Sequence, residues 1–232
     1  MEPIVTSYAG LLDQSGFKQW YKYQKLRAAY GYDAEEVSFL MGKPSFYFRD
    51  YEMMETGAKL TFDDESALSE IFCNQRLETL DFADDDFGVY EKRIIRIQRT
   101  ESLEAIDYLI TTPWRLKGRS NPARFKIREE KWGTISGEEE TDLRRQVSHA
   151  LDKLLTSGFF RCGRSGLEVY HEVEARIRWS PYLRPRYVKQ TAYQKISADQ
   201  LSLKANNGLL LFQDAWLNAM LSSVDNETYY SL

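Results

Sequence analysis

The chain has 232 residues, 43% of them hydrophobic and 14% aromatic, which is enough to bury the cores of one large or two to three small domains. This composition excludes a disordered chain, and no stretch approaches the roughly 18 consecutive apolar residues of a membrane-spanning helix. The net charge of −4 is unevenly distributed: residues 1–112 hold 12 Lys and Arg against 21 Asp and Glu (−9), residues 113–197 hold 18 against 10 (+8), and residues 198–232 hold 1 against 4 (−3). A polyanion would therefore meet a basic region in the second half of an acidic chain.

The N-terminal segment suggests two helices and no export signal. We expect an apolar helix over residues 3–13 and a longer helix from Phe17 to Ala29. The segment has no basic region followed by an apolar run, so we expect a cytoplasmic protein. Cys73 and Cys162 lack the CxxC spacing of a redox or zinc site, which favours two reduced thiols.

The segment from Leu26 to Glu52 is typical of two short helices joined by a tight turn. Asp33 and Glu36 have the spacing of a capping box at the start of the first helix. Gly42 stands where the chain must reverse, because glycine takes positive φ without a steric penalty, and Pro44 suits the first turn of the next helix. The residues expected to face inward are Val37, Leu40 and Met41 in the first helix and Phe48 and Tyr51 in the second.

This segment resembles the phage-repressor type of helix-turn-helix, the Cro/XRE-like domain, over roughly residues 17–75. The matching residues are Leu26, Arg27, Gly31, Tyr32, Ala34, Glu35, Glu36, Val37, Leu40, Gly42, Ser45, Phe48, Tyr51 and Glu52. The resemblance implies a compact helical domain whose third helix could lie in a major groove, with Ser45 and Arg49 as DNA contacts. The same helix carries Phe46, Asp50 and Met53, which are poor partners for bases. A helical domain that packs against protein therefore remains the alternative.

The middle of the chain predicts a linker and a small β-structure. A helix capped by Asp64 is expected to run to about Leu80, followed by a solvated acidic linker over residues 81–88. The segments 89–100 and 104–112 favour an antiparallel hairpin, and 123–128 a further short strand. Between them lies a basic loop that could contact phosphates, with Arg115, Lys117, Arg119, Arg124 and Lys126.

The C-terminal third indicates three helices and a hairpin. Ser136 with Glu139, and Ser165 with Glu168, have the spacing of capping boxes. Arg184 and Pro185 begin a third helix, and two strands follow around an Asn206-Asn207-Gly208 turn. The inward residues expected for the first helix are Leu143, Val147, Leu151 and Leu154.

This order resembles a winged helix from about Glu138 to Gln213. Its third helix would place Val188, Ala192 and Ile196 inward, and the opposite face would present residues suited to bases and phosphates: Arg186, Tyr187, Gln190, Tyr193 and Gln194, flanked by Arg184 and Lys189. An ordinary amphipathic helix with a polar exterior is the alternative.

The sequence gives little indication of catalysis. Its two histidines, His149 and His171, have no metal-ligand spacing, and no phosphate-binding glycine loop occurs, so we expect no metal and no cofactor. The predicted fold is mainly α with a small antiparallel β-hairpin insert: a Cro/XRE-like helical domain over 1–80, an acidic linker and hairpin insert over 81–135, and a winged-helix-like domain over 136–232. The predicted function is transcriptional regulation by binding double-stranded DNA, and a homodimer would fit a two-fold operator. The alternative is a protein–protein interaction module or adaptor whose helix-turn-helix no longer reads DNA.

Overall fold

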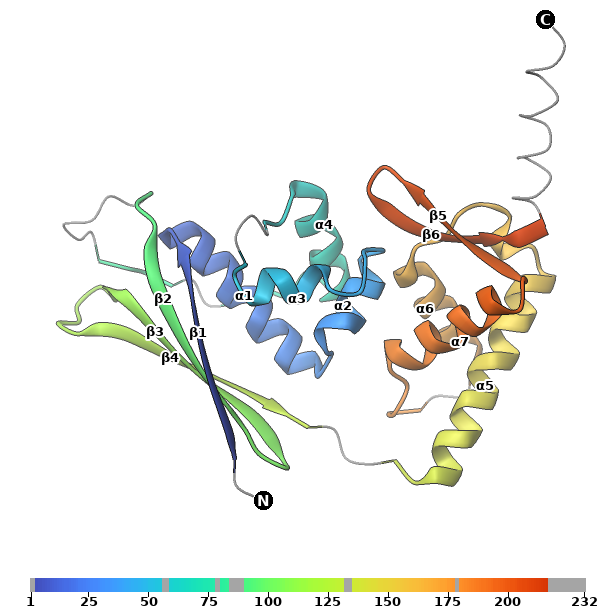
Figure 1. Ribbon diagram of the computed structural model, residues 1–232, viewed down its shortest axis with the longest axis horizontal. Coiled ribbons are helices and arrows are strands. Elements are labelled where there is room, and N and C mark those ends of the chain that lie inside the picture. Colours follow the sequence, from blue (N-terminus) through green and yellow to red (C-terminus); the bar gives the residue numbers. More distant parts are fainter. Residues whose placement is uncertain are drawn as a thin grey trace, which may run out of the picture. The chain divides into compact units, whose positions relative to one another are not determined.

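A computed structural model describes residues 3–55, 59–77, 80–83, 90–131, 135–177 and 180–216 of the chain (Figure 1). The chain divides into two compact units, unit 1 (Met1–Ala34 and Phe46–Gly133) and unit 2 (Glu35–Ser45 and Thr134–Leu232). This division differs from the three consecutive segments expected, because residues 35–45 join the C-terminal unit. None of the helices formed by the described residues is long and apolar enough to cross a membrane.

The expectation of a mainly α fold with one small hairpin is wrong. The described residues form seven α-helices and six strands, and four of the strands make an antiparallel sheet. The main error lies at residues 3–13, which form strand β1 (Ile4–Leu12) and not a helix. β1 pairs along its whole length with β2 (Arg93–Glu101), a partner some 90 residues away in the sequence. The hydrogen bonds to β2 hold residues 4–12 in a strand, a conformation that the β-branched residues Ile4, Val5 and Thr6 also favour.

The sheet of unit 1 has the order β1-β2-β3-β4, with β3 spanning Ala105–Arg115 and β4 spanning Pro122–Glu130. The expected hairpin is therefore its β2–β3 part. Helix α1 (Gln14–Tyr30), capped by Asp13, packs on one face. Phe17 at the start of α1 has its ring 5.9 Å from Trp114 of β3 and 5.5 Å from Phe125 of β4. Because strand residues alternate between faces, the other face of the sheet takes no part in this core.

Two shorter helices complete unit 1, α3 (Tyr47–Glu52) and α4 (Phe62–Ile71). Phe48 and Tyr51 of α3 are buried, as predicted. Helix α4 is capped by Thr61, with Asp64 as the reciprocal member of the capping box, and it ends well before Leu80. Its end is followed by positive φ values at Cys73 and Asn74, a backbone conformation that a helix cannot continue through.

Unit 2 contains helices α5 (Gly137–Thr156), α6 (Gly166–Arg176) and α7 (Pro185–Ser197), a short 3-10 helix η1 (Phe159–Arg161), and a hairpin of β5 (Leu201–Asn206) and β6 (Leu209–Asp214). Both predicted capping boxes are present, at Ser136 and Ser165. Asn207 and Gly208 both have positive φ, 48° and 76°, as a type I′ hairpin turn requires. The predicted element order of this region is thus confirmed.

Helix α2 (Ala34–Leu40), the first helix of the Leu26–Glu52 motif, packs in unit 2. Gly42 has the predicted positive φ, 65°, and its carbonyl accepts a 2.6 Å hydrogen bond from the N–H of Leu210. The approach at Gly166 is closer still, since a Cβ there would lie 2.0 Å from the carbonyl oxygen of Phe39. α3, in contrast, belongs to unit 1. The two helices of the motif therefore do not share one compact domain, which corrects the Cro-like arrangement expected from the sequence.

Candidate nucleic-acid interface

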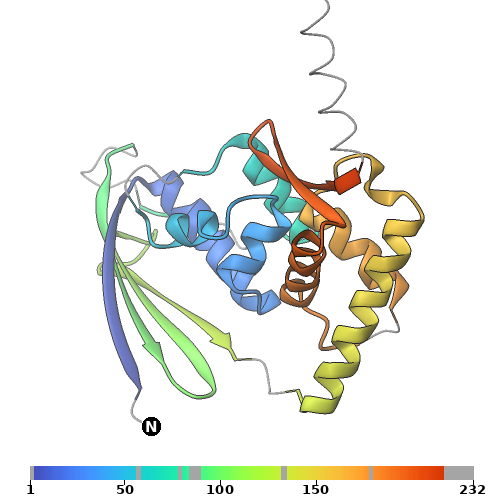
Figure 2. The ribbon, with the colours of Figure 1, turned by 45° about the vertical axis from the view of Figure 1, so that its right-hand side comes forward.

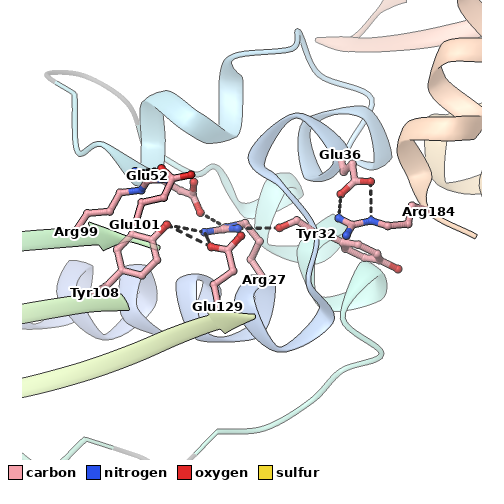
Figure 3. Close-up of polar contacts among 9 residues, drawn as sticks. All are labelled: Arg27, Tyr32, Glu36, Glu52, Arg99, Glu101, Tyr108, Glu129 and Arg184. Carbon is pink, nitrogen blue, oxygen red and sulfur yellow. Dashed lines mark hydrogen bonds and ion pairs between the residues drawn. The ribbon is translucent and has the colours of Figure 1, made fainter. Parts of the chain in front are cut away.

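Helix α7 is held at its N-terminus by a buried carboxylate from α2. The Arg184 guanidinium donates two hydrogen bonds to Glu36, one of them 3.1 Å from Nε to Oε1 (Figure 3). The backbone N–H of Arg186 donates to the same oxygen at 3.2 Å. The Glu36 side chain is only 1% exposed. It therefore satisfies an orphan N–H at the start of α7 and places a negative charge at the positive end of the helix dipole.

The Glu36 contact corrects the role expected for Arg184. This residue was expected to flank a DNA-reading face, but it is 7% exposed and its charge is neutralised inside unit 2. Tyr187 was expected on the reading face and is also buried. At 100° per residue, Tyr187 lies next to Val188 and Thr191 on the side of α7 that faces the core. Neither side chain is available at the surface of this unit.

Lys189 is directed towards α2 and the turn that follows it. Its Nζ donates to Glu35 Oε2 at 2.9 Å and to Ser45 Oγ at 3.2 Å. Ser45, expected to contact DNA from the same helix as Arg49, thus belongs to a polar cluster of unit 2, whereas Arg49 belongs to unit 1. Both Lys189 and Ser45 help to hold α2 against α7.

The remaining predicted residues of α7 form one exposed stripe. Arg186, Gln190, Tyr193 and Gln194 are all exposed, and the spacing of four, three and one residues puts them on one side of the helix. Tyr193 is 40% exposed, and its ring makes an edge contact, 6.2 Å between centroids, with Phe212 of β6. α7 contains three basic residues and no acidic one. We call these four residues the α7 stripe.

Arg144 of α5, which sequence reasoning missed, extends the α7 stripe. Its guanidinium lies 5.1 Å from the centroid of the Tyr187 ring, and that of Arg186 lies 5.0 Å from the same ring. Arg144 Nη1 also donates to Gln190 Oε1 at 2.8 Å. The same guanidinium pairs with Glu140 Oε1 at 2.7 Å, and its bond to Gln190 occupies the acceptor of that carboxamide. Only the packing of α5 against α7 brings these residues together.

The predicted contacts in unit 1 lie in three places. Arg49 on α3 is exposed, with its guanidinium 4.3 Å from the Phe46 ring centroid and 3.1 Å from Asp50 Oδ1. Arg115 ends β3, and Lys117 and Arg119 follow it in an exposed turn. Arg124 and Lys126, the last two basic residues of the expected loop, lie in β4, in agreement with the short strand predicted over 123–128.

Unit 1 also contains a buried charged cluster around Arg27 (Figure 3). The guanidinium donates to Glu52 of α3, to Glu129 of β4 at 2.8 Å, to the Tyr108 hydroxyl at 3.4 Å and to the Tyr32 carbonyl at 2.7 Å. Burial raises the pKa of Glu52 above its ordinary value, while the charge of Arg27 opposes that rise. The cluster joins α1, α3 and the sheet, and its buried, mutually satisfied groups indicate a structural role.

No protein-family model, curated protein or solved structure matches the chain. Within the described part of the chain, no three His, Cys, Asp or Glu side chains are grouped so as to hold a metal ion. The function must therefore be inferred from the geometry of the surface.

Proposed function

We propose that this protein is a transcriptional regulator that binds double-stranded DNA through the α7 stripe, in the manner of a winged helix. The observation that carries the proposal is the stripe itself: Arg186, Gln190, Tyr193 and Gln194 are exposed together on a helix without acidic residues. Arginine pairs bidentately with guanine, glutamine donates to base acceptors, and tyrosine reaches phosphates. The helix precedes a hairpin, as a recognition helix does in a winged helix.

Rigidity supports the same proposal. A reading helix must be held firmly, so that few rotamers are lost when its side chains meet bases. Glu36 fixes the start of α7 at Arg184 and at the N–H of Arg186, and α5 orients Gln190 through Arg144. The proposal includes a cytoplasmic location, where the protein would meet DNA. It also includes a homodimer, and a palindromic preferred site would be the evidence for it.

Replacing Arg186 by alanine is expected to weaken binding to a preferred duplex by about 1–3 kcal/mol and to relax the preference at one or two base positions. The matched control is Arg49→Ala, which removes an exposed arginine of unit 1 that is already paired with Asp50. The measurement is selection of bound sequences from a randomised duplex pool, followed by titration of the best sequence. Equal losses for the two variants would contradict the assignment of the reading face to α7.

A protein partner is the second candidate, favoured by exposed apolar side chains in unit 1. Phe46 and Met53, at either end of α3, are 53% and 39% exposed. Such residues suit a protein interface better than phosphates. An interaction module would bind no duplex even at low salt, where non-specific contacts are strongest.

A further inference from the structure

The sheet of unit 1 has one face that is not covered by α1 (Figures 1 and 2). The inward face includes Ile95, Ile97, Ile110 and Trp114, which are buried. The strand register places the alternate residues on the opposite face, which we call the open face. Its rows across the four strands are Ala9–Arg96–Thr111–Arg124, Ser7–Gln98–Leu109–Lys126 and Val5–Thr100–Asp107–Arg128.

The open face has an excess of positive charge. Arg96, Arg124 and Lys126 are exposed and form no ion pair with any described residue. The fourth cation, Arg128, pairs with Asp107 at 3.2 Å and with Glu130 at 2.6 Å. These two carboxylates therefore neutralise Arg128 and not the other three cations. Three cations without an ion pair to a described residue therefore lie in two neighbouring rows of the open face.

The same rows contain a shallow groove. It has a volume of about 550 Å³ and is lined by Arg96 and Gln98 of β2, by the small side chains of Ser7, Ala9 and Thr111, and by Tyr8 and Leu109. Arg96 and Arg124 are two strands apart, or about 10 Å, with Thr111 between them. Arg96 in the groove and Arg124 beside Thr111 place two cations where an anionic backbone that crosses the sheet could meet them.

We propose that the open face of unit 1 is a second nucleic-acid contact, which binds the phosphates of duplex DNA through Arg96, Arg124 and Lys126. Charge complementarity identifies the phosphates. None of the residues in these three rows is aromatic, which argues against single strands, whose bases need aromatic platforms to stack on. This inference rests on the proposed function, because it adds a sequence-independent contact to the sequence-reading α7 stripe.

The test uses the full chain with Arg96→Gln, Arg124→Gln and Lys126→Gln combined. The control combines Lys25→Gln, Lys59→Gln and Arg76→Gln, which removes the same charge from exposed positions of unit 1 outside the sheet. Binding to a mixed-sequence duplex is titrated between about 50 and 200 mM salt. If the variant has lost three phosphate contacts, raising the salt over this range should reduce the wild-type affinity by a factor about 40 times larger than it reduces the affinity of the open-face variant.

The outcomes separate the two proposals. Equal salt dependence of the wild type and the open-face variant, or equal loss in the control, would overturn the open-face contact and leave the α7 proposal standing. No duplex binding by the folded wild type would overturn both. Tighter binding to single strands than to duplexes would also overturn the open-face proposal. A variant with Arg124→Lys should keep the wild-type salt dependence, because it keeps the charge.

Discussion

Replacing Glu36 by alanine is expected to destabilise unit 2 by about 3–5 kcal/mol, the usual cost of removing one partner from a buried ion pair. Without Glu36, the buried Arg184 would lose the carboxylate with which it pairs, and the N–H of Arg186 would lose this acceptor. The measurement is the free energy of unfolding in urea, with hydrogen exchange locating the loss. The amides of α7 should lose protection first.

The neighbouring residue provides the control for Glu36. Glu35 pairs with Lys189 but its side chain is 54% exposed, so Glu35→Ala should cost no more than about 1 kcal/mol. Replacing both buried partners, Glu36→Leu with Arg184→Leu, should recover much of the stability, because no unpaired charge remains. A similar loss from Glu35→Ala and Glu36→Ala would refute the role of Glu36 as the buried anchor of α7.

Replacing Arg27 by methionine should destabilise unit 1 by a similar amount, about 3–5 kcal/mol, because Glu52 and Glu129 would lose their shared cation. The control is Lys25→Met on the same helix, an exposed position where little change is expected. The same urea titration measures both variants.

The loss in the Arg27→Met variant should depend on pH. The pKa of Glu52 in the folded protein is raised above its ordinary 4.5 by burial, and removing Arg27 should raise it further. A raised pKa means that the folded state takes up a proton more readily than the unfolded state, so acid favours folding at this group. The destabilisation should be full at pH 8 and should shrink as the pH falls towards 4.5. A loss that grows in acid would contradict this account.

The local features of the fold were predictable because they depend on a few adjacent residues. The capping boxes at Ser136 and Ser165, the positive φ of Gly42 and the Asn207-Gly208 turn are all set by backbone chemistry within a span of about five residues. The partners of each element were not predictable in this way. β1 forms a strand because β2 pairs with it, and no local pattern records that partner.

The same limit explains the errors in the candidate site. Periodicity placed the α7 stripe on one side of the helix, but it could not show that Glu36 would meet Arg184 some 148 residues later. Arg184 and Tyr187 were expected at the surface because the helical projection placed them away from Val188, Ala192 and Ile196. Arg96 was missed for a related reason: once residues 3–13 are taken as a helix, the sheet has no fourth strand and no continuous open face.

The Leu26–Glu52 motif has a different role from the one its resemblance implied. α2 supplies Glu36 to anchor α7, and α3 supplies Glu52 to the Arg27 cluster. Both helices contribute buried carboxylates to packing. Under the proposed function, DNA is read by α7, about 140 residues after the motif that first indicated DNA.

The most direct test of the proposed function is a titration of a fluorescent mixed-sequence duplex with the purified chain at about 50 mM salt, followed by fluorescence anisotropy. We expect saturable binding with a dissociation constant of about 100 µM or lower. Added salt should weaken this binding, and the Arg186→Ala variant should bind more weakly than the wild type. A folded chain that leaves the anisotropy unchanged up to about 100 µM would contradict the proposal that this protein binds DNA.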